Sequence, residues 1–174
     1  DVGADITAGD DLAITWEASS DWPEQASADM TFHVTATALC PQGGDDTADG
    51  WVEVNHRWVR NFYANGAVTM SDRDTGLMWV YDADANGKEN WSNAKSKCSN
   101  LTYAGHDDWF LPDKNQLKGM YSQKGHFKDV RSSWYWSSTP CSSYAYHVSM
   151  DDGDVGGYKA PSRDYWVWPC RGGQ

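Results

Sequence analysis

The sequence predicts an α+β fold, because strand patterns come first, two helical patterns follow, and strand patterns return towards the end of the chain. Met30–Ala36 alternates apolar residues with Thr and His, which is the two-residue period of a half-buried strand. Trp91–Leu101 and the segment after Pro112 carry apolar residues at helical spacing. From Tyr135 onward the pattern is one of strands and turns alone.

Residues 1–48 are expected to form an N-terminal β segment. Leu12–Trp16 is its first strand, and the alternating segment described above is its second. Asp21–Pro23 is a bend between them, and Gln42–Gly50 has the Gly- and Asp-rich composition of a linker or long loop. An alternative is that this segment is the end of a preceding β-sandwich domain.

Residues 51–174 are expected to form one domain that carries the function. Phe62–Asp72 is predicted to be a hairpin that turns at Asn65-Gly66. The helix over Trp91–Leu101 then has an apolar face on which Cys98 points inward.

A second helix is predicted to begin after Asp113, whose side chain can cap it. Gln116 stands three residues later and completes a capping box. Gly125 is expected to end this helix. Its inward stripe consists of Leu117, Met120 and Tyr121.

Charge and hydropathy exclude two classes of partner. Acidic residues outnumber basic ones by 25 to 14, so the net charge is −11 and a nucleic-acid partner is not expected, since phosphate contacts need clustered Lys and Arg. No apolar run approaches the roughly 20 residues of a membrane span. The acidity can serve solubility alone, or it can serve calcium or a basic partner.

The four cysteines, Cys40, Cys98, Cys141 and Cys170, are far apart in the sequence. None stands in a Cys-x-x-Cys pair, which argues against a zinc or redox site. They favour an oxidising compartment, with three full pairings open. The alternative is unpaired, buried thiols in a reducing compartment.

Four short blocks follow one another in a fixed order: Gly76–Trp79, Asp108–Pro112, Tyr135–Ser138 and Cys170–Gly173. Together with the helix at Trp91–Leu101, they resemble the family named for the C-terminal domain of a bacterial collagen-like adhesin. The resemblance covers roughly residues 61–173. It implies a C-type-lectin-like fold, related to the formylglycine-generating-enzyme type. More loosely, Leu12–Ala38 resembles the segment that precedes such domains in large bacterial surface proteins, which implies an extracellular or cell-surface location.

The same resemblance implies roles for individual residues. A Cys98–Cys170 disulfide is implied first, although Cys170 stands one residue later than the family pattern has it, and Cys40–Cys141 would then be the second disulfide. The implied core residues are Trp79, Trp109, Leu111, Pro112 and Trp136.

No pattern in the sequence predicts catalysis. The five histidines form neither His-x-His nor His-Glu-x-x-His, no two cysteines are close in sequence, and there is no Gly-x-Ser-x-Gly motif or phosphate loop. We therefore expect no enzyme, with a degenerate relative of the formylglycine-generating enzymes as the remote alternative.

Calcium is the cofactor that the sequence admits. Asp82, Asp84 and Asn86, followed by Gly87, reproduce the first half of an EF-hand loop. The twelfth position should be Glu and is Asn93, so another acid such as Glu89 would have to complete the site. A solvated turn is the alternative. Because the triplets of sugar-binding C-type lectins are missing, calcium-bridged sugar recognition is not expected.

The region from Arg131 to Trp168 is the predicted binding surface. It is rich in Ser, Tyr, Trp, Asp, Gly and His, the mixture that builds paratopes. Strand alternation in Tyr144–Met150 predicts that Tyr146, Val148 and Met150 point inward, while His147, Ser149 and Asp151 point outward. An ordinary wet hairpin region is the alternative. The predicted ligand-binding residues are Ser132, Trp134, Tyr144, His147, Ser149, Asp151, Asp154, Gly156, Tyr158, Lys159, Asp164 and Trp166.

This composition also resembles the variable proteins of diversity-generating retroelements, in which adenine-bearing codons near the C-terminus are randomised. The sequence therefore predicts a surface-displayed module that binds a protein or glycan on another cell or host through a diversified patch. The alternative is a constant adhesin or glycan-binding domain.

Overall fold

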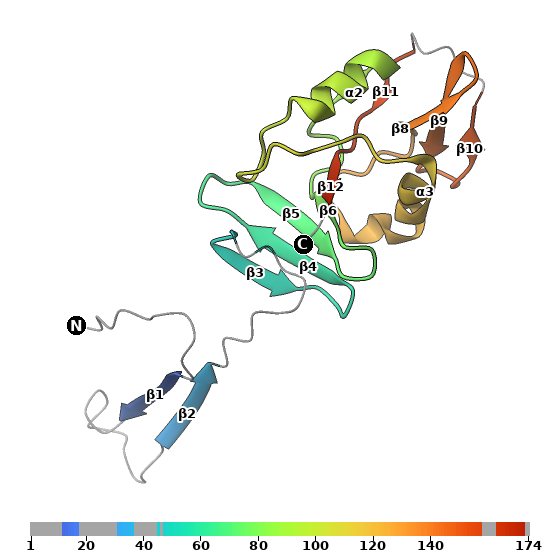
Figure 1. The fold of residues 1–174 in the computed structure, drawn as a ribbon. Coiled ribbons are helices and arrows are strands. Elements are labelled where there is room, and N and C mark those ends of the chain that lie inside the picture. Colours follow the sequence, from blue (N-terminus) through green and yellow to red (C-terminus); the bar gives the residue numbers. More distant parts are fainter. Residues whose placement is uncertain (1–11, 18–30, 37–44, 46, 158–162, 173–174) are drawn as a thin grey trace. The chain divides into compact units, whose positions relative to one another are not determined.

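The structure is a computed structural model in which residues 12–17, 31–36, 45, 47–157 and 163–172 are described (Figure 1). The chain divides into two compact units, Asp1–Pro41 and Gln42–Gln174. No helix in the described ranges is long and apolar enough to cross a membrane.

The first unit contains an antiparallel pair of strands. β1 (Leu12–Glu17) pairs with β2 (Thr31–Ala36), with Ile14 opposite Val34. The two strands expected from the sequence are therefore confirmed. The bend at Asp21–Pro23 lies outside the described residues.

The second unit begins with a five-stranded antiparallel sheet in the order β12-β6-β5-β4-β3. The predicted hairpin at its centre is confirmed, because Gly66 turns the chain with φ of 81° and donates its N–H to Tyr63 O. The strands of this sheet are β3 (Gly50–Glu53), β4 (Trp58–Phe62), β5 (Val68–Asp72), β6 (Leu77–Val80) and β12 (Cys170–Gly172).

A second five-stranded sheet has the order β10-β9-β8-β11-β7. β11 runs parallel to β8, and the other neighbours pair antiparallel. Its strands are β7 (Lys88–Glu89), β8 (Trp134–Cys141), β9 (Tyr144–Ser149), β10 (Val155–Gly156) and β11 (Tyr165–Trp166).

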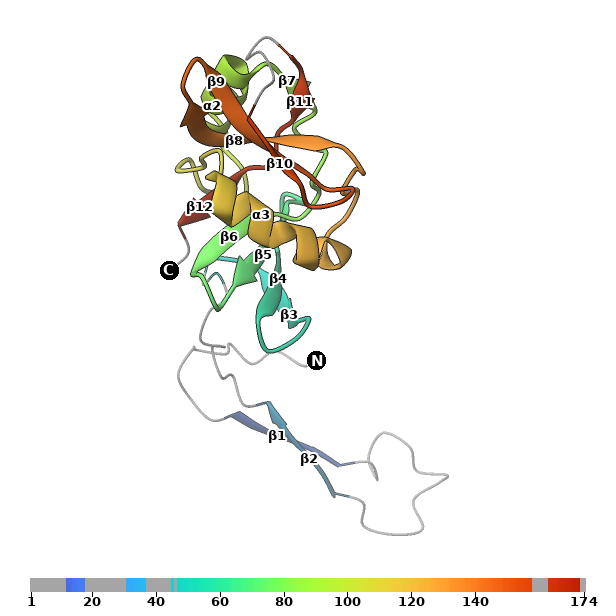
Figure 2. The ribbon, with the colours of Figure 1, turned by 90° about the vertical axis from the view of Figure 1, so that its right-hand side faces the viewer.

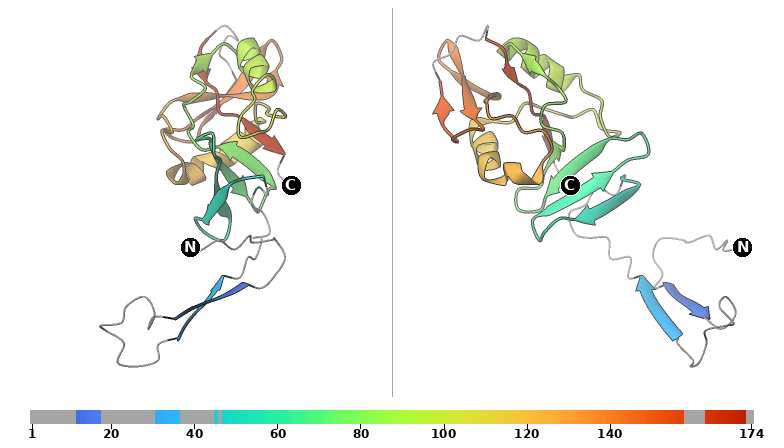
Figure 3. Two further views of the ribbon diagram at one scale, coloured as in Figure 1. Left: turned by 90° about the vertical axis from the view of Figure 1, so that its left-hand side faces the viewer. Right: turned by 180° about the vertical axis from the view of Figure 1, so that it is seen from behind.

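Two helices accompany the sheets: α2 (Trp91–Ser99), and α3 (Lys114–Gln123), which continues into the 3-10 turn η1 (Lys124–His126). The predicted capping box of α3 is confirmed. Asp113 accepts hydrogen bonds from the N–H groups of Asn115 and Gln116, and the Gln116 side chain accepts one from the Asp113 N–H. α3 lies between the two sheets (Figure 2), and α2 lies at the end of the unit away from β3 (Figure 3).

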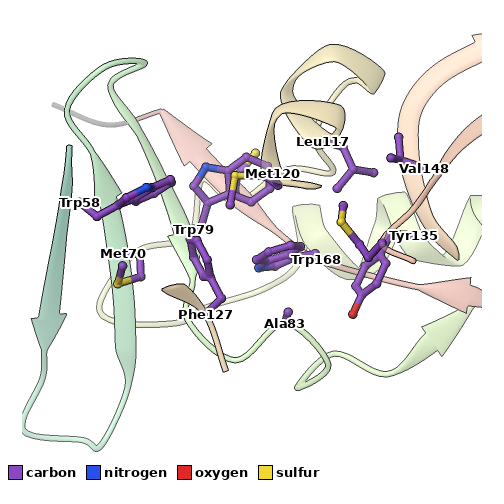
Figure 4. Packing of buried hydrophobic residues seen from close by; sticks show 12 residues of the cluster. Trp58, Met70, Trp79, Ala83, Leu117, Met120, Phe127, Tyr135, Val148 and Trp168 are labelled. Carbon is purple, nitrogen blue, oxygen red and sulfur yellow. The ribbon is translucent and has the colours of Figure 1, made fainter. Parts of the chain in front are cut away.

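The main core joins both sheets and α3. Trp58 and Met70 come from the first sheet, Leu117 and Met120 from α3, and Val148 from the second sheet (Figure 4). Indole groups also link elements by hydrogen bonds, because Trp58 donates to Gln123 Oε1 and Trp168 donates to Val80 O. Two helices packed with two mainly antiparallel sheets make this unit an α+β fold.

The four ordered sequence blocks meet in this unit. Cys170 of β12 pairs with Trp79 of β6 and bridges to Phe110, and Arg171 pairs with Asp108 at 2.6 Å. Ser138 of β8 donates its N–H to Pro112 O. The blocks are therefore mutual packing partners, which explains why their order can identify a fold.

Candidate functional site

The predicted ligand-binding residues fall into four groups. Ser132, Asp151, Asp154 and Asp164 are exposed, whereas Trp134, Gly156 and Trp166 are half-buried. His147 and Ser149 are buried. The Tyr144 side chain, Tyr158 and Lys159 lie outside the described residues.

The outward orientation predicted for His147 and Ser149 is wrong. Both faces of β9 are covered, so alternation does not send one set of side chains to solvent. Val148 packs into the main core, as expected, on the face towards α3. On the other face the His147 ring is 2% exposed and lies 4.7 Å from the Trp134 ring and 5.1 Å from the Tyr165 ring.

Ser149 has a local structural role instead of a ligand contact. Its hydroxyl accepts hydrogen bonds from the N–H groups of Asp151 and Asp152, at 3.2 and 3.4 Å. These bonds shape the turn between β9 and β10, so Ser149 positions the exposed Asp151.

Gly156 sits where no larger residue fits. It pairs with His147 across β10 and β9, and a Cβ at this position would lie 2.3 Å from His147 Nε2. Glycine thus lets β10 approach the imidazole. The contribution of Gly156 to a binding surface is to hold the hairpin that carries Asp151 and Asp154.

The predicted residues that remain accessible as side chains define what we call the C-terminal patch: Ser132, Trp134, Asp151, Asp154, Asp164 and Trp166. Met150 donates its N–H to Ser133 O, which brings the turn that carries Asp151 beside the start of β8. Trp134 of β8 pairs with Ser149 of β9, and the Trp134 ring lies 6.5 Å from the Tyr165 ring. Tyr165 directly follows Asp164 in the sequence.

Trp166 connects the C-terminal patch to a second charged region. Its ring stacks on Tyr135 at 6.4 Å and lies 5.0 Å from the Lys88 ammonium and 5.9 Å from the Arg131 guanidinium. Arg131 in turn pairs with Asp84 at 2.5 Å. The predicted ligand residue and the predicted metal-ligand loop therefore share a neighbour.

The acidic loop brings three carboxylates together: Asp82, Asp84 and Asp129 offer ligand atoms within 4.8 Å of one another. Carboxylate oxygens suit a hard cation such as Ca²⁺. However, Lys128 Nζ lies 2.5 Å from Asp82 Oδ2, and Arg131 Nε lies 2.6 Å from Asp84 Oδ2. Both cations therefore compete with a metal for these oxygens. Asp82 Oδ1 is buried without a hydrogen-bond partner among the described residues, so it is an oxygen that neither cation occupies.

The remaining parts of the predicted calcium site have other partners. The Asn86 carbonyl accepts a hydrogen bond from Lys97, and Glu89 pairs with Lys97 at 2.8 Å. Asp129 joins Asp82 and Asp84, although it is distant in sequence. Sequence reasoning missed Asp129 because only the pairing of Lys128 with Asp82 brings that segment close.

A buried polar cluster that the sequence did not predict lies at Asp45. This carboxylate is 3% exposed and accepts hydrogen bonds from the Tyr63 hydroxyl, from Thr47 Oγ1 at 2.7 Å and from His106 Nε2 at 2.6 Å. Burial alone would raise the pKa of Asp45, but these donors outweigh it and lower the pKa to about 2. Asp45 belongs to a Gly- and Asp-rich run that gave no signal other than that of a linker.

Cys98, Cys141 and Cys170 are free thiols in the structure, so the predicted Cys98–Cys170 bridge is not formed there. Cys40, the predicted partner of Cys141, lies outside the described residues. Burial raises the pKa of Cys98 to about 12. Burial also raises the pKa of Cys170, and the neighbouring Cys98 adds to this shift, so the two thiols lie near each other.

Comparison with known proteins supports the family resemblance that the four blocks carry. A search of curated proteins finds no match. A family model described as the Lcl C-terminal domain matches residues 68–171, which is more than half of the chain. This range includes β5, both helices and most of β12, and it contains every residue of the C-terminal patch. The chain belongs to the Lcl C-terminal domain family.

Proposed function

We propose that this chain is an adhesin-like binding module, displayed outside the cell or on its surface, that recognises a protein or glycan through the C-terminal patch. Membership of the Lcl C-terminal domain family supports an adhesin-like role. The observation that carries the proposal is the patch itself. The half-buried indoles of Trp134 and Trp166 and the exposed carboxylates of Asp151, Asp154 and Asp164 come from segments that pair around the start of β8.

The chemistry of the patch suits non-covalent recognition. Half-buried indoles supply rigid contact area at little cost in conformational entropy. Carboxylates accept hydrogen bonds from sugar hydroxyls and pair with Lys or Arg of a protein. The ligand is therefore rich in hydrogen-bond donors, and an anionic target is not expected.

Catalysis is not part of this proposal. A thiol nucleophile reacts as the thiolate and needs a lowered pKa. Cys98 and Cys170 are buried with raised pKa values, which argues against the formylglycine-type alternative. A turnover assay with Cys-containing peptides tests this directly, and formylglycine formation would contradict a purely binding role.

The C-type-lectin-like architecture and genetic diversification form the finer part of the proposal. Diversification would be confined to exposed positions such as Asp151, Asp154 and Asp164. The packing of His147 and Gly156 favours constancy at those positions. The genomic test is a near-identical template repeat with adenine-only differences beside a reverse transcriptase gene. Its absence favours the alternative of a constant adhesin or glycan-binding domain.

The binding proposal is tested by replacing Asp151, Asp154 and Asp164 together with Ala, and Trp166 separately with Ala. Screening of glycan and cell-surface protein arrays with the wild-type chain first identifies a ligand. We expect each variant to lose about tenfold or more in affinity, since a charge-assisted hydrogen bond to a carboxylate contributes about 1.5–3 kcal/mol and truncation of a Trp at a binding hot spot costs about 2 kcal/mol or more. The triple variant should keep its melting temperature, because its residues are exposed.

A matched control replaces three exposed polar residues of α3 with Ala: Asn115, Lys118 and Ser122. It should bind like wild type. Equal binding by the control and the triple variant would contradict the C-terminal patch as the site. Repeating the measurement with calcium and with a chelator separates this direct recognition from a calcium-dependent lectin.

A further inference from the structure

Asp45 is held by groups that lie far from it in the sequence. Its carboxylate accepts hydrogen bonds from the Tyr63 hydroxyl, just after β4, and from His106 in the loop between α2 and α3. The Asp45 N–H donates to Asn61 Oδ1 of β4 at 3.2 Å. These partners are 18, 61 and 16 residues away along the chain. Separate elements therefore converge on one aspartate, as they would on a ligand.

The side chains behind Asp45 form a polar floor, which consists of Asn61, Tyr63, Thr69 and Ser71. Asn61 is fully buried, and its Nδ2 donates to Thr69 Oγ1 at 3.1 Å and to Ser71 Oγ at 2.9 Å. The Tyr63 hydroxyl lies 3.3 Å from Thr69 Oγ1. Buried positions of a sheet usually carry apolar side chains. The polar floor is therefore suited to an occupant that forms hydrogen bonds.

The loop that carries His106 is shaped by its own contacts. Tyr103 and His106 exchange two main-chain hydrogen bonds, of 2.9 and 3.0 Å. The residues between them, Ala104 and Gly105, have φ angles of 56° and 80°, as a type I′ turn requires. Trp109 Nε1 also donates to the His106 carbonyl at 3.2 Å. Because none of these bonds involves the aspartate, they hold His106 in place without it.

The segment that carries Asp45 has weaker support. We call it the strap, and its described residues are 45 and 47–49. Thr47 and Asp49 are exposed, and Ala48 is half-buried. Thr47 bonds back to Asp45 through its N–H at 2.9 Å and its hydroxyl at 2.7 Å, while Asp49 accepts from the Ala64 N–H. The strap thus presents one aspartate, in a turn of its own making, to a floor that other contacts hold.

Electrostatics favour a carboxylate at this place. The pKa of Asp45 is lowered to about 2 although burial alone would raise it, so the donors stabilise the charged form more than burial destabilises it. Burial raises the pKa of Tyr63, and the bond to Asp45 adds to this shift, so the hydroxyl stays protonated and remains a donor. The buried Arg171 also acts on Tyr63, which places a cation behind the floor.

We infer that Asn61, Tyr63 and His106 form a binding site for an aspartate side chain. Asp45 fills the site within its own chain, and an aspartate of a partner protein fills it when the strap is displaced. A tethered group has a high effective concentration, so Asp45 keeps free carboxylates out of the intact chain. The site uses no residue of the C-terminal patch, so the inference goes beyond the proposed function.

Chemical rescue of the full chain tests the site. Asp45→Ala removes the carboxylate, and sodium formate supplies the same group as the probe, with sodium chloride at equal ionic strength for comparison. We expect formate to raise the melting temperature of Asp45→Ala as its concentration rises, because a ligand that binds the folded state stabilises it. Wild type and Asp45→Asn should not respond, since their own side chains occupy the site.

If Asp45→Ala does not fold in buffer alone, the same comparison is made in sucrose, which strengthens folding by its exclusion from the protein surface. Formate and chloride acting equally on Asp45→Ala in either medium would overturn the inference.

A second pair of variants assigns the effect to this site. Adding Tyr63→Phe to Asp45→Ala removes one donor, so the apparent affinity for formate should fall about tenfold, the effect of losing one hydrogen bond to a charged group. Tyr121→Phe removes a hydroxyl that bonds to Asp151 O and has no part in the site, so it should leave the response unchanged. A response that survives Tyr63→Phe undiminished would mean that formate acts elsewhere, which also contradicts the inference.

A peptide comparison separates a partner's aspartate from a free carboxylate. The peptide acetyl-Asp-Asp-Thr-Ala-amide copies the strap from residue 45 onward. Without its own aspartate, the strap of Asp45→Ala loses its carboxylate bonds, so the peptide should displace it and raise the melting temperature. The peptide with Asn in the first position should have no effect. Rescue by formate but by neither peptide would overturn the assignment of the site to a partner's aspartate, and equal rescue by both peptides would overturn the requirement for a carboxylate.

Discussion

Asp45 is an ionised carboxylate that is held inside the second unit by hydrogen bonds. Its pKa lies near 2, below the ordinary value of 3.8. A group whose pKa falls on folding stabilises the folded chain above its unfolded pKa. That stabilisation is complete above about pH 5 and is lost as the pH falls from about 4 through about 2.

Replacement of Asp45 by Asn should therefore destabilise the unit in a pH-dependent way. The shift in pKa corresponds to about 2 kcal/mol at neutral pH. Urea unfolding measured between pH 7 and pH 2 should show this difference at pH 7 and its decline towards zero at pH 2. A difference that is equally large at both pH values would mean that the charge of Asp45 contributes nothing. Thr47→Ala, which removes only one of the donors to Asp45, should cost less at pH 7.

At the residue scale, the sequence predicted which carboxylates are exposed better than it predicted the neighbours of buried or clustered side chains. Asp151, Asp154 and Asp164 were expected at the surface and lie there. His147 was expected outside because strand alternation assumes one wet face, and β9 has none. Asp45 and Asp129 were missed because their neighbours come from distant parts of the chain. Polar character alone does not reveal such partners.

At the element scale, local signals predicted the helices well. Asp113 and Gln116 stand at the positions that a capping box requires, and the box depends on neighbours within one turn. The short strands β7, β10 and β11 gave no comparable signal. Each has two residues, so tertiary pairing decides that they are strands at all.

Asp113→Ala should lower the free energy of unfolding by about 1 kcal/mol, the usual cost of losing an N-cap. Its carboxylate accepts from two helix N–H groups, which then lack an acceptor within the cap. Asn115→Ala is the control, because its exposed side chain has no part in the box. Chemical denaturation of both variants measures the effect. Equal stability of the two would argue against any contribution from the cap.

At the scale of the whole molecule, a disulfide between the two buried thiols would link α2 covalently to β12. Cys98 and Cys170 are neighbours in space but far apart in the sequence, so a bond between them would close a long loop. In an oxidising medium we expect this bridge to form. It would stabilise the fold by about 4 kcal/mol if the loop-entropy account holds.

Mass spectrometry of peptides from the non-reduced protein detects the bridge, and melting curves with and without reductant measure its effect. Cys98→Ala should remove the dependence on reductant, whereas Cys141→Ala should retain it. Alkylation of both Cys98 and Cys170 in denatured, non-reduced protein would show that they stay unpaired.

The order of the four blocks was the most informative property of the sequence because each block contacts another. Pairing of Cys170 with Trp79 and of Arg171 with Asp108 gives that order a physical basis. The sequence therefore predicted the α+β class and the family. It did not predict the two-sheet arrangement, since the parallel pairing of β11 with β8 depends on contacts that no local pattern encodes.

β12 has a consequence for how the protein is made. It pairs with β6, and Cys170 bridges to Phe110, while Trp168 just before it fills the main core. During synthesis, β6 and both helices leave the ribosome well before these closing residues. Until β12 has been synthesised, the main core is therefore incomplete. Domains fold as units, so the earlier elements cannot finish folding before then. A copy that stops before Trp168 lacks this indole in the main core and is therefore a target for chaperones and proteases.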